Sequence, residues 1–225
     1  HSPVVGGPKY RKMYHDQPEH AQHYYACLTA MDEQIGRLRA KLKSLGIADN
    51  TMIFFCSDNG PARQGSPRHI GTAKNLKGYK LSLNEGGIRV PGLMIWPAKI
   101  TEPRTVTAPC FTSDYFPTIL AALKIPLPSN RAYDGVDILP FAIGKQIERK
   151  KPLGFLNKDG KEAAWIENRY KLISRKKGNE LYDLINDPGE KINLIEKAPK
   201  IAKRMEGQLL NWRTGVIAEL KLIPK

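Results

Sequence analysis

The sequence of 225 residues has few cysteines and no long apolar run. Its three cysteines, Cys27, Cys56 and Cys110, lie far apart and lack the paired spacing of a disulfide framework or a zinc site. No stretch approaches the roughly 18 consecutive apolar residues that a membrane-spanning helix requires. Internal repeats and low-complexity segments are absent as well. These absences exclude a disulfide-stapled small domain, an apolar membrane span and a repeat protein.

Negative charge is also scarce, because 36 Lys and Arg residues face only 22 Asp and Glu residues. The formal net charge of +14 favours anionic partners, such as nucleic acid, anionic lipid or acidic polysaccharide, without choosing between them. Hydrophobic residues make up 41% of the chain, which is enough to bury a core and excludes a disordered tail.

A short apolar run that ends in polar residues is the first informative pattern. Residues 51–56 (TMIFFC) are rich in aromatic and β-branched side chains, which predicts a strand covered on both faces. Asp58, Asn59 and Gly60 follow directly. Ligands of α/β sheets bind at the C-terminal ends of strands, so these residues are candidates for a site. On this stretch alone, a plain turn is the favoured explanation of the same residues.

The surrounding pattern predicts an α/β sheet. A helix is expected over residues 19–45, where apolar residues recur at steps of four and three: Tyr24, Leu28, Met31, Ile35, Leu38, Leu42 and Leu45. After the strand, a loop rich in glycine and lysine covers residues 61–87, and a second apolar run covers residues 88–96. Helix, strand, long loop and strand in this order are typical of an α/β sheet whose functional surface lies in its loops.

The last third of the chain predicts a smaller α+β unit. Antiparallel strands are expected over residues 163–174 and 181–184, followed by an amphipathic helix over residues 199–212. A loop-like stretch with three prolines and a charged end, residues 126–151, precedes this unit. Upstream of it, Asp114 stands at a predicted helix start, where capping is favoured over a role as catalytic acid.

The long loop contains a glycine pair and a lysine of interest. Gly86 and Gly87 predict a close approach of the backbone to another group, because neither carries a Cβ atom. Lys80, seven residues before Gly87, is able to reach the same space as a mobile positive charge, although alone it is an ordinary surface lysine. Glu85 and Arg89 are expected to brace the loop by pairing.

Together these segments resemble a known family. SDNGP, then GYKLSLNEGGIRVP, and a leading His-Ser-Pro are similar to the C-terminal portion of the type I, formylglycine-dependent sulfatases, of the alkaline-phosphatase-like superfamily. Three downstream segments extend the resemblance over nearly the whole chain: TSDYFPTILAALKIP, YDGVDILPFAIG and ELYDLINDPGEKINL. The resemblance implies part of an alkaline-phosphatase-like α/β sandwich, with a central mixed sheet flanked by helices. Residues 1–144 would form the C-terminal half of the catalytic domain, and residues 145–225 a small α+β subdomain with an antiparallel sheet.

The resemblance also implies site residues. Asp58 and Asn59 match the pair that binds a divalent metal, usually calcium, and Lys80 matches the lysine that binds the sulfate and steadies charge on the leaving oxygen. His1 matches a histidine near the sulfate and the leaving group, with a catalytic and substrate-binding role. The Cys/Ser-x-Pro-x-Arg motif that yields the formylglycine nucleophile, and an early Asp-Asp pair of metal ligands, are not in this sequence. Formylglycine is therefore expected in an upstream region, and the 225 residues alone are expected to be inactive.

The function implied is sulfuric ester hydrolysis, on a sulfated small molecule, a sulfated polysaccharide or an aryl or alkyl sulfate. An exported enzyme is expected, with no nucleic-acid partner and no membrane span. Two alternatives stay open at this point. One is a phosphoryl or phosphonate hydrolase of the same superfamily, and the other is a non-catalytic basic module that binds sulfated glycans.

Overall fold

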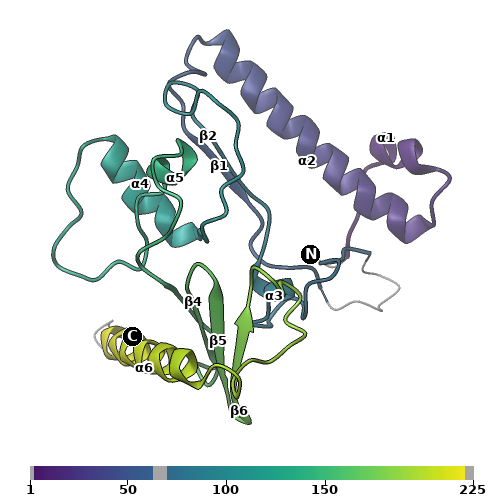
Figure 1. Cartoon of the computed structure of the whole chain (residues 1–225). Coiled ribbons are helices and arrows are strands. Elements are labelled where there is room, and N and C mark those ends of the chain that lie inside the picture. The colour runs from purple at the N-terminus through teal and green to yellow at the C-terminus, as the bar shows by residue number, and fades with distance from the viewer. Residues whose placement is uncertain (1–2, 63–69, 221–225) are drawn as a thin grey trace.

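The structure, a computed structural model, describes residues 3–62 and 70–220 of the chain. The described residues form two antiparallel sheets with helices around them (Figure 1). The N-terminal helical elements are α1 (Pro8–Arg11), the short 3-10 helix η1 (Lys12–Tyr14) and the long helix α2 (Glu19–Ser44). No helix in the described ranges combines the length and apolarity needed to cross a membrane.

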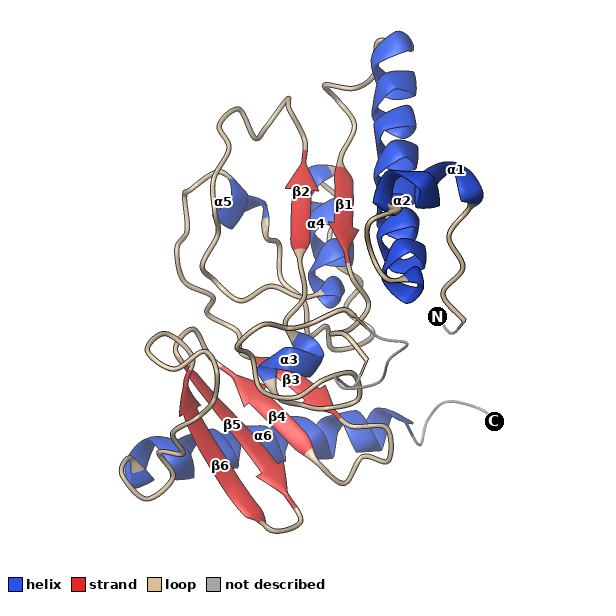
Figure 2. Cartoon of the chain, turned by 90° about the vertical axis from the view of Figure 1, so that its right-hand side faces the viewer, coloured by secondary structure: helices blue, strands red, loops and turns tan. Residues whose placement is uncertain are grey.

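The first sheet has two strands, β1 (Ile53–Cys56) and β2 (Gly92–Ile95), which pair antiparallel with Ile53 opposite Ile95. Helices α4 (Tyr115–Ala122) and α5 (Leu139–Ala142) follow in the chain, α4 being preceded by the 3-10 helix η2 (Thr112–Asp114). The Phe54 ring of β1 stacks on the Tyr115 ring of α4, with 4.3 Å between their centroids. This contact joins β1 to the start of α4, which passes behind the two strands in Figure 2.

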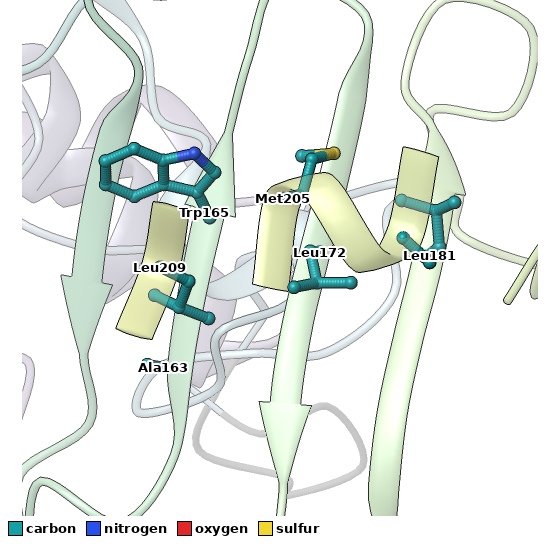
Figure 3. Packing of buried hydrophobic residues seen from close by; sticks show 7 residues of the cluster. Ala163, Trp165, Leu172, Leu181, Met205 and Leu209 are labelled. Atoms are coloured by element: carbon teal, nitrogen blue, oxygen red, sulfur yellow. The ribbon is translucent and has the colours of Figure 1, made fainter. Parts of the chain in front are cut away.

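The second sheet has four strands in the order β3-β4-β5-β6, all antiparallel. Its elements are β3 (Leu153–Leu156), β4 (Ala163–Ile166), β5 (Tyr170–Arg175) and β6 (Gly178–Asp183), and the helix α6 (Pro199–Leu220) packs against it. Trp165, Leu172 and Leu181 lie on one face of the sheet. They form one buried cluster with Met205 and Leu209 of α6, which covers that face (Figure 3).

The opposite face of this sheet is also covered. Ala164, Ile173 and Tyr182 lie one residue along each strand from the α6-facing positions, so they point the other way. They pack against Leu83, which belongs to the long loop that follows β1 in the chain. Covering on both faces explains why all four residues of β4 are buried. It also places the short helix α3 (Glu85–Ile88) between the two sheets (Figure 2).

Most predicted elements agree with the structure in type and differ at their ends, but the predicted loop 126–151 contains α5, and the predicted strand region 163–174 forms the two strands β4 and β5. Helix α2 spans residues 19–44 where 19–45 was predicted, and β1 begins at Ile53 rather than at residue 51. The apolar run 88–96 contributes a strand only over Gly92–Ile95, because its start belongs to α3. Helix α6 continues to Leu220 instead of ending at residue 212, and β3 was not predicted.

Asp114 caps a helix start and also anchors a distant part of the chain. Its Oδ2 accepts a hydrogen bond from the Phe111 amide (2.9 Å), and its Oδ1 accepts one from the Val136 amide (2.8 Å). The Arg149 guanidinium donates to both carboxylate oxygens at 2.8 and 2.9 Å, with both side chains almost fully buried. Trp212 of α6 adds a hydrogen bond to Asp134 at 2.9 Å. The segments on either side of residue 144 are thus held together by buried polar contacts.

Candidate functional site

Asp58 and Asn59 leave the C-terminal end of β1, as the sequence predicted for a site at a strand end. The Asp58 carboxylate is exposed, and its Oδ1 accepts a hydrogen bond of 2.8 Å from Asn59 Nδ2. The Ser57 hydroxyl donates to the Asn59 carbonyl at 3.1 Å, which narrows the turn. These contacts hold a carboxylate and a side-chain amide next to each other at the surface.

The turn rests directly on helix α3. The Gly60 amide donates to the Gly87 carbonyl at 2.9 Å. A Cβ atom on Gly60 would lie 1.8 Å from the Gly86 carbonyl oxygen, so only glycine fits without a shift of the backbone. This contact brings together Gly60 and Gly87, which lie 27 residues apart in the chain, and it explains the glycine after Asp58 and Asn59.

The loop that carries Lys80, described over residues 70–84 and called the lysine loop from here on, folds onto the same helix. The Gly86 amide donates to the Lys77 carbonyl (2.7 Å), and a Cβ atom on Gly87 would lie 2.1 Å from the Ser82 carbonyl oxygen. The predicted close approach at the glycine pair is therefore confirmed, and the group approached is the backbone of the lysine loop. The Lys80 amide donates to the Pro61 carbonyl at 2.8 Å, which places Lys80 beside the turn after β1.

The backbone next to Lys80 adopts an uncommon conformation. Leu81 has φ +78°, in the left-handed region that a branched residue seldom occupies, and its side chain is 81% exposed. Such strain persists only where surrounding contacts impose it, and it often accompanies a functional position. Within the described ranges, the Lys80 ammonium has no hydrogen-bond or ion-pair partner.

Lys77, three residues earlier, has a different environment. Its Nζ donates to the Tyr182 hydroxyl at 2.9 Å and lies 5.0 Å from the centroid of the Tyr182 ring. Burial lowers the pKa of Lys77, but the hydrogen bond to Tyr182 and the nearby carboxylates of Glu180 and Glu190 outweigh it, so the pKa is raised. Lys77 thus stays protonated and ties the loop to β6.

A cluster of buried charged side chains joins α3 to β5. Lys171 of β5 is fully buried, and its Nζ lies 2.8 Å from Glu85 Oε1 and 2.9 Å from Glu190 Oε1. The Glu85 amide donates to Glu190 Oε2 at 2.8 Å. The predicted pairing of Glu85 with Arg89 is confirmed at 3.6 Å, but it is the longer of the two ion pairs that Glu85 makes.

Lys171 and Glu190 were not singled out from the sequence. The available signal was the strand pattern of YKLISR, in which Lys171 shares a face with Ile173. A lysine on the buried face of a strand requires a carboxylate partner, because an unpaired buried ammonium is very unfavourable. The pattern does not indicate which carboxylate that is.

The donor chemistry at Asp58 and Asn59 suits a hard cation. A carboxylate and an amide carbonyl are oxygen ligands of the kind that calcium prefers, and calcium takes about six to eight of them. Among residues 3–62 and 70–220, no group of three or more His, Cys, Asp or Glu side chains is placed to hold a metal ion. The two residues therefore fit calcium in kind but supply a minority of the ligands. His1 lies outside the described residues.

Two family models match the chain. One, described as sulfatase, matches residues 1–125, and the other, described as N-sulphoglucosamine sulphohydrolase, C-terminal, matches residues 79–215. The N-acetylgalactosamine-6-O-sulfatase of Bacteroides thetaiotaomicron is 30% identical over 208 residues, which cover 82% of this chain and 40% of the relative. The steryl-sulfatase of Rattus norvegicus is 36% identical over 125 residues, covering 54% of this chain and 22% of the relative.

Solved structures have the same fold. The crystal structure of Ps i-CgsB in complex with k-i-k-neocarrahexaose superimposes with a TM-score of 0.84 at 26% identity. The match covers 95% of this chain and 48% of that chain. The chain thus spans less than half the length of these relatives.

Proposed function

The chain belongs to the sulfatase family, and on that basis we propose that it contributes the sulfate-binding lysine and a metal-binding pair to a sulfuric ester hydrolase. One observation carries the proposal. The turn with Asp58 and Asn59 and the loop with Lys80 are hydrogen-bonded to the same short helix and to each other. A metal ion at Asp58 and Asn59 and the ammonium of Lys80 would place two positive charges on neighbouring segments. This arrangement suits a sulfate group, because its negative charge is spread over several oxygens.

Lys80 would bind the sulfate and balance the charge that moves to the leaving oxygen. Positive charge that is already in position stabilises such a transition state more than the ground state. The ammonium must be free of other partners to do this. Among the residues that the structure describes, Lys80 has no such partner, whereas the Lys77 ammonium is hydrogen-bonded to Tyr182. The uncommon backbone at Leu81 supports the same assignment.

Asp58 and Asn59 would hold the divalent metal, calcium in the family at large. When bound, that ion neutralises charge on sulfate oxygens and polarises them. The role of this chain is to present the carboxylate and the amide at the end of β1. Its exposed position leaves the Asp58 carboxylate accessible to an ion and to further ligands from elsewhere in the protein. His1, by its resemblance to the family histidine, would donate a proton to the leaving group.

We further propose a sulfated sugar or polysaccharide as the substrate class. The net charge of +14 favours a polyanion, and the relatives include sulfatases named for N-acetylgalactosamine 6-sulfate. Formylglycine as nucleophile, export from the cytoplasm and the division of the chain at residue 144 are further parts of the proposal and rest on the family. The comparisons do not favour a phosphoryl hydrolase or a non-catalytic module.

The test is a kinetic comparison of two lysines of one loop in the full-length gene product. Lys80→Ala should lower kcat on a small aryl sulfate about 100-fold, as loss of a preorganised charge partner does. Lys74→Ala is the matched control, because Lys74 is exposed in the same loop and has a positive φ that alanine tolerates about as well. Its kcat should stay within about twofold of the wild type. Equal effects of the two substitutions would refute the role of Lys80.

A further inference from the structure

Helix α3 (Glu85–Ile88) is hydrogen-bonded to both parts of the proposed site. The Gly87 carbonyl of α3 accepts a hydrogen bond from the Gly60 amide in the turn after β1. The Gly86 amide of α3 donates a hydrogen bond to the Lys77 carbonyl in the lysine loop. A four-residue helix has too few internal hydrogen bonds to be stable alone, so its position must come from outside. Whatever fixes α3 also fixes the distance between Asp58 and Lys80.

The outside support is the buried charge cluster. Glu85 is the first residue of α3, and its Oε1 pairs with the Lys171 ammonium at 2.8 Å. Its backbone amide donates to the Glu190 carboxylate at 2.8 Å. All three side chains are at most 5% exposed. Ions taken out of water are costly unless they keep their partners, so displacement of α3 from β5 would expose unpaired charge. The cluster therefore opposes displacement of α3 from β5.

The charges of the cluster are nearly balanced. One ammonium meets two carboxylates, and the Arg89 guanidinium, 3.6 Å from Glu85 Oε2, adds a second positive charge from the solvent side. Lys171 itself belongs to β5, a central strand of the sheet that is covered on both faces. The support for α3 thus comes from the best-packed part of the molecule.

We propose that Lys171, Glu85 and Glu190 are positioning residues that set the geometry of Lys80 relative to Asp58 and Asn59. The inference rests on the proposed function for its kinetic consequence only. The small C-terminal sheet would then act in catalysis without touching the substrate. It would do so by fixing the position of α3, to which both parts of the site are hydrogen-bonded.

The chain offers a matched control in a second buried ion pair. Asp114 and Arg149 are as buried as the cluster and also join the last third of the chain to the rest. Their other hydrogen-bond partners are outside α3 and the lysine loop: Phe111, Thr118, Asp134, Val136, Lys151 and Asn168. Loss of either ion pair should lower stability, but only loss of the cluster should disturb the site.

The first experiment needs no activity. In the full-length gene product, Lys171→Met should accelerate hydrogen exchange at the amides of Gly60 and Gly86, because each of these hydrogen bonds has one partner in α3. Exchange at the Lys80 amide should rise as well, because its acceptor, the Pro61 carbonyl, directly follows the Gly60 that is bonded to α3. Arg149→Met should leave exchange in these peptides as in the wild type. Glu190→Gln, which keeps the pair between Lys171 and Glu85, guards against failure of Lys171→Met to fold and should give a smaller acceleration. Unchanged exchange in folded cluster variants, or equal acceleration in Arg149→Met, would overturn the proposal.

The second experiment is a kinetic cycle on an aryl sulfate. Lys171→Met should lower kcat about 10- to 100-fold with KM within about threefold, because misplacement of a catalytic group acts mainly on the transition state. In a Lys80→Ala background the same substitution should lower kcat less than about threefold, since the group to be positioned is absent. Equal losses in both backgrounds would overturn the coupling to Lys80. A wild type without sulfate hydrolysis would refute the proposed function instead, and hydrogen exchange alone would then decide the positioning.

Discussion

The C-terminal sheet and helix α2 differ in how much of their apolar surface is covered. Leu172 and Leu181 are completely buried on the face of the sheet that α6 covers. The lysine loop covers the opposite face. In the 26 residues of α2 only Ala21 and Ala26 are buried, while Leu38 is 51% exposed. Burial of apolar area is the main source of stability, so the sheet carries its own core and α2 contributes little to one. The proposed site is anchored on the well-covered side.

The largest expected effect separates the two regions by core truncation. In the 225-residue chain, Leu172→Ala should lower the free energy of unfolding by about 2–5 kcal/mol, because it leaves a cavity in a closed core. Leu38→Ala should change it by less than about 0.5 kcal/mol. Denaturant unfolding measures both. A cost for Leu38→Ala as large as that for Leu172→Ala would show that the face of α2 is covered in solution and would break the comparison.

The next effect concerns the contact between the turn after β1 and α3. Gly60→Ala should cost about 1–3 kcal/mol of unfolding free energy, since the added methyl group would meet the Gly86 carbonyl at 1.8 Å. Gly92→Ala in β2 is the control, because a Cβ atom there meets nothing within 4 Å. The same unfolding measurement applies. Equal costs at the two glycines would mean that the contact between turn and helix is looser than the structure has it.

A smaller effect sharpens the comparison through pH. The hydrogen bond from Arg169, then those from Asn186 and the Ile185 amide, lower the pKa of Asp183 from 3.8 to about 2 against an opposing effect of burial. A carboxyl whose pKa is lower in the folded state stabilises the fold above its unfolded pKa, and this contribution is lost as the pH falls from about 4 towards 2. Asp183→Asn should therefore flatten the acid branch of the stability curve.

The control for this pH effect lies on α2. Asp32 is exposed there, and Asp32→Asn should leave the acid branch as steep as in the wild type. Thermal unfolding between about pH 5 and pH 2 gives both curves. If the two variants behave alike, the acid sensitivity does not come from the C-terminal sheet.

The smallest effect is expected at the surface pair that joins the start of the chain to α2. Lys9 Nζ lies 3.0 Å from Glu33 Oε2, and both side chains are well exposed. Exposed ion pairs contribute little and are screened by salt. Lys9→Ala should shift the melting temperature less than Asp183→Asn does, and the shift should disappear in about 1 M salt. A larger shift of the melting temperature that does not depend on salt would show that this ion pair stabilises α2 more than an exposed pair is expected to.

Local patterns in the sequence determined much of the fold. The apolar period of residues 19–45 predicted α2, the run TMIFFC predicted β1, and the amphipathic pattern from residue 199 predicted α6. Each pattern works because an element of this kind repeats its buried positions at a fixed spacing. Strand β3 and helix α3, of four residues each, were not predicted, and they form because β4 pairs with the strand and Lys171 of β5 supports the helix.

The sequence by itself also determined which residues are candidates for the site, through the motifs around Asp58, Asn59 and Lys80 and the need for glycine at two adjacent positions. Only the tertiary structure decided how the charges are shared. Lys77 and Lys80 look alike in the sequence, yet Lys77 reaches Tyr182, 105 residues away. Lys171 pairs with Glu85 across 86 residues. Contacts over such separations depend on how α3 lies against β5, and because that arrangement results from the packing of whole elements, no spacing between neighbouring residues encodes it.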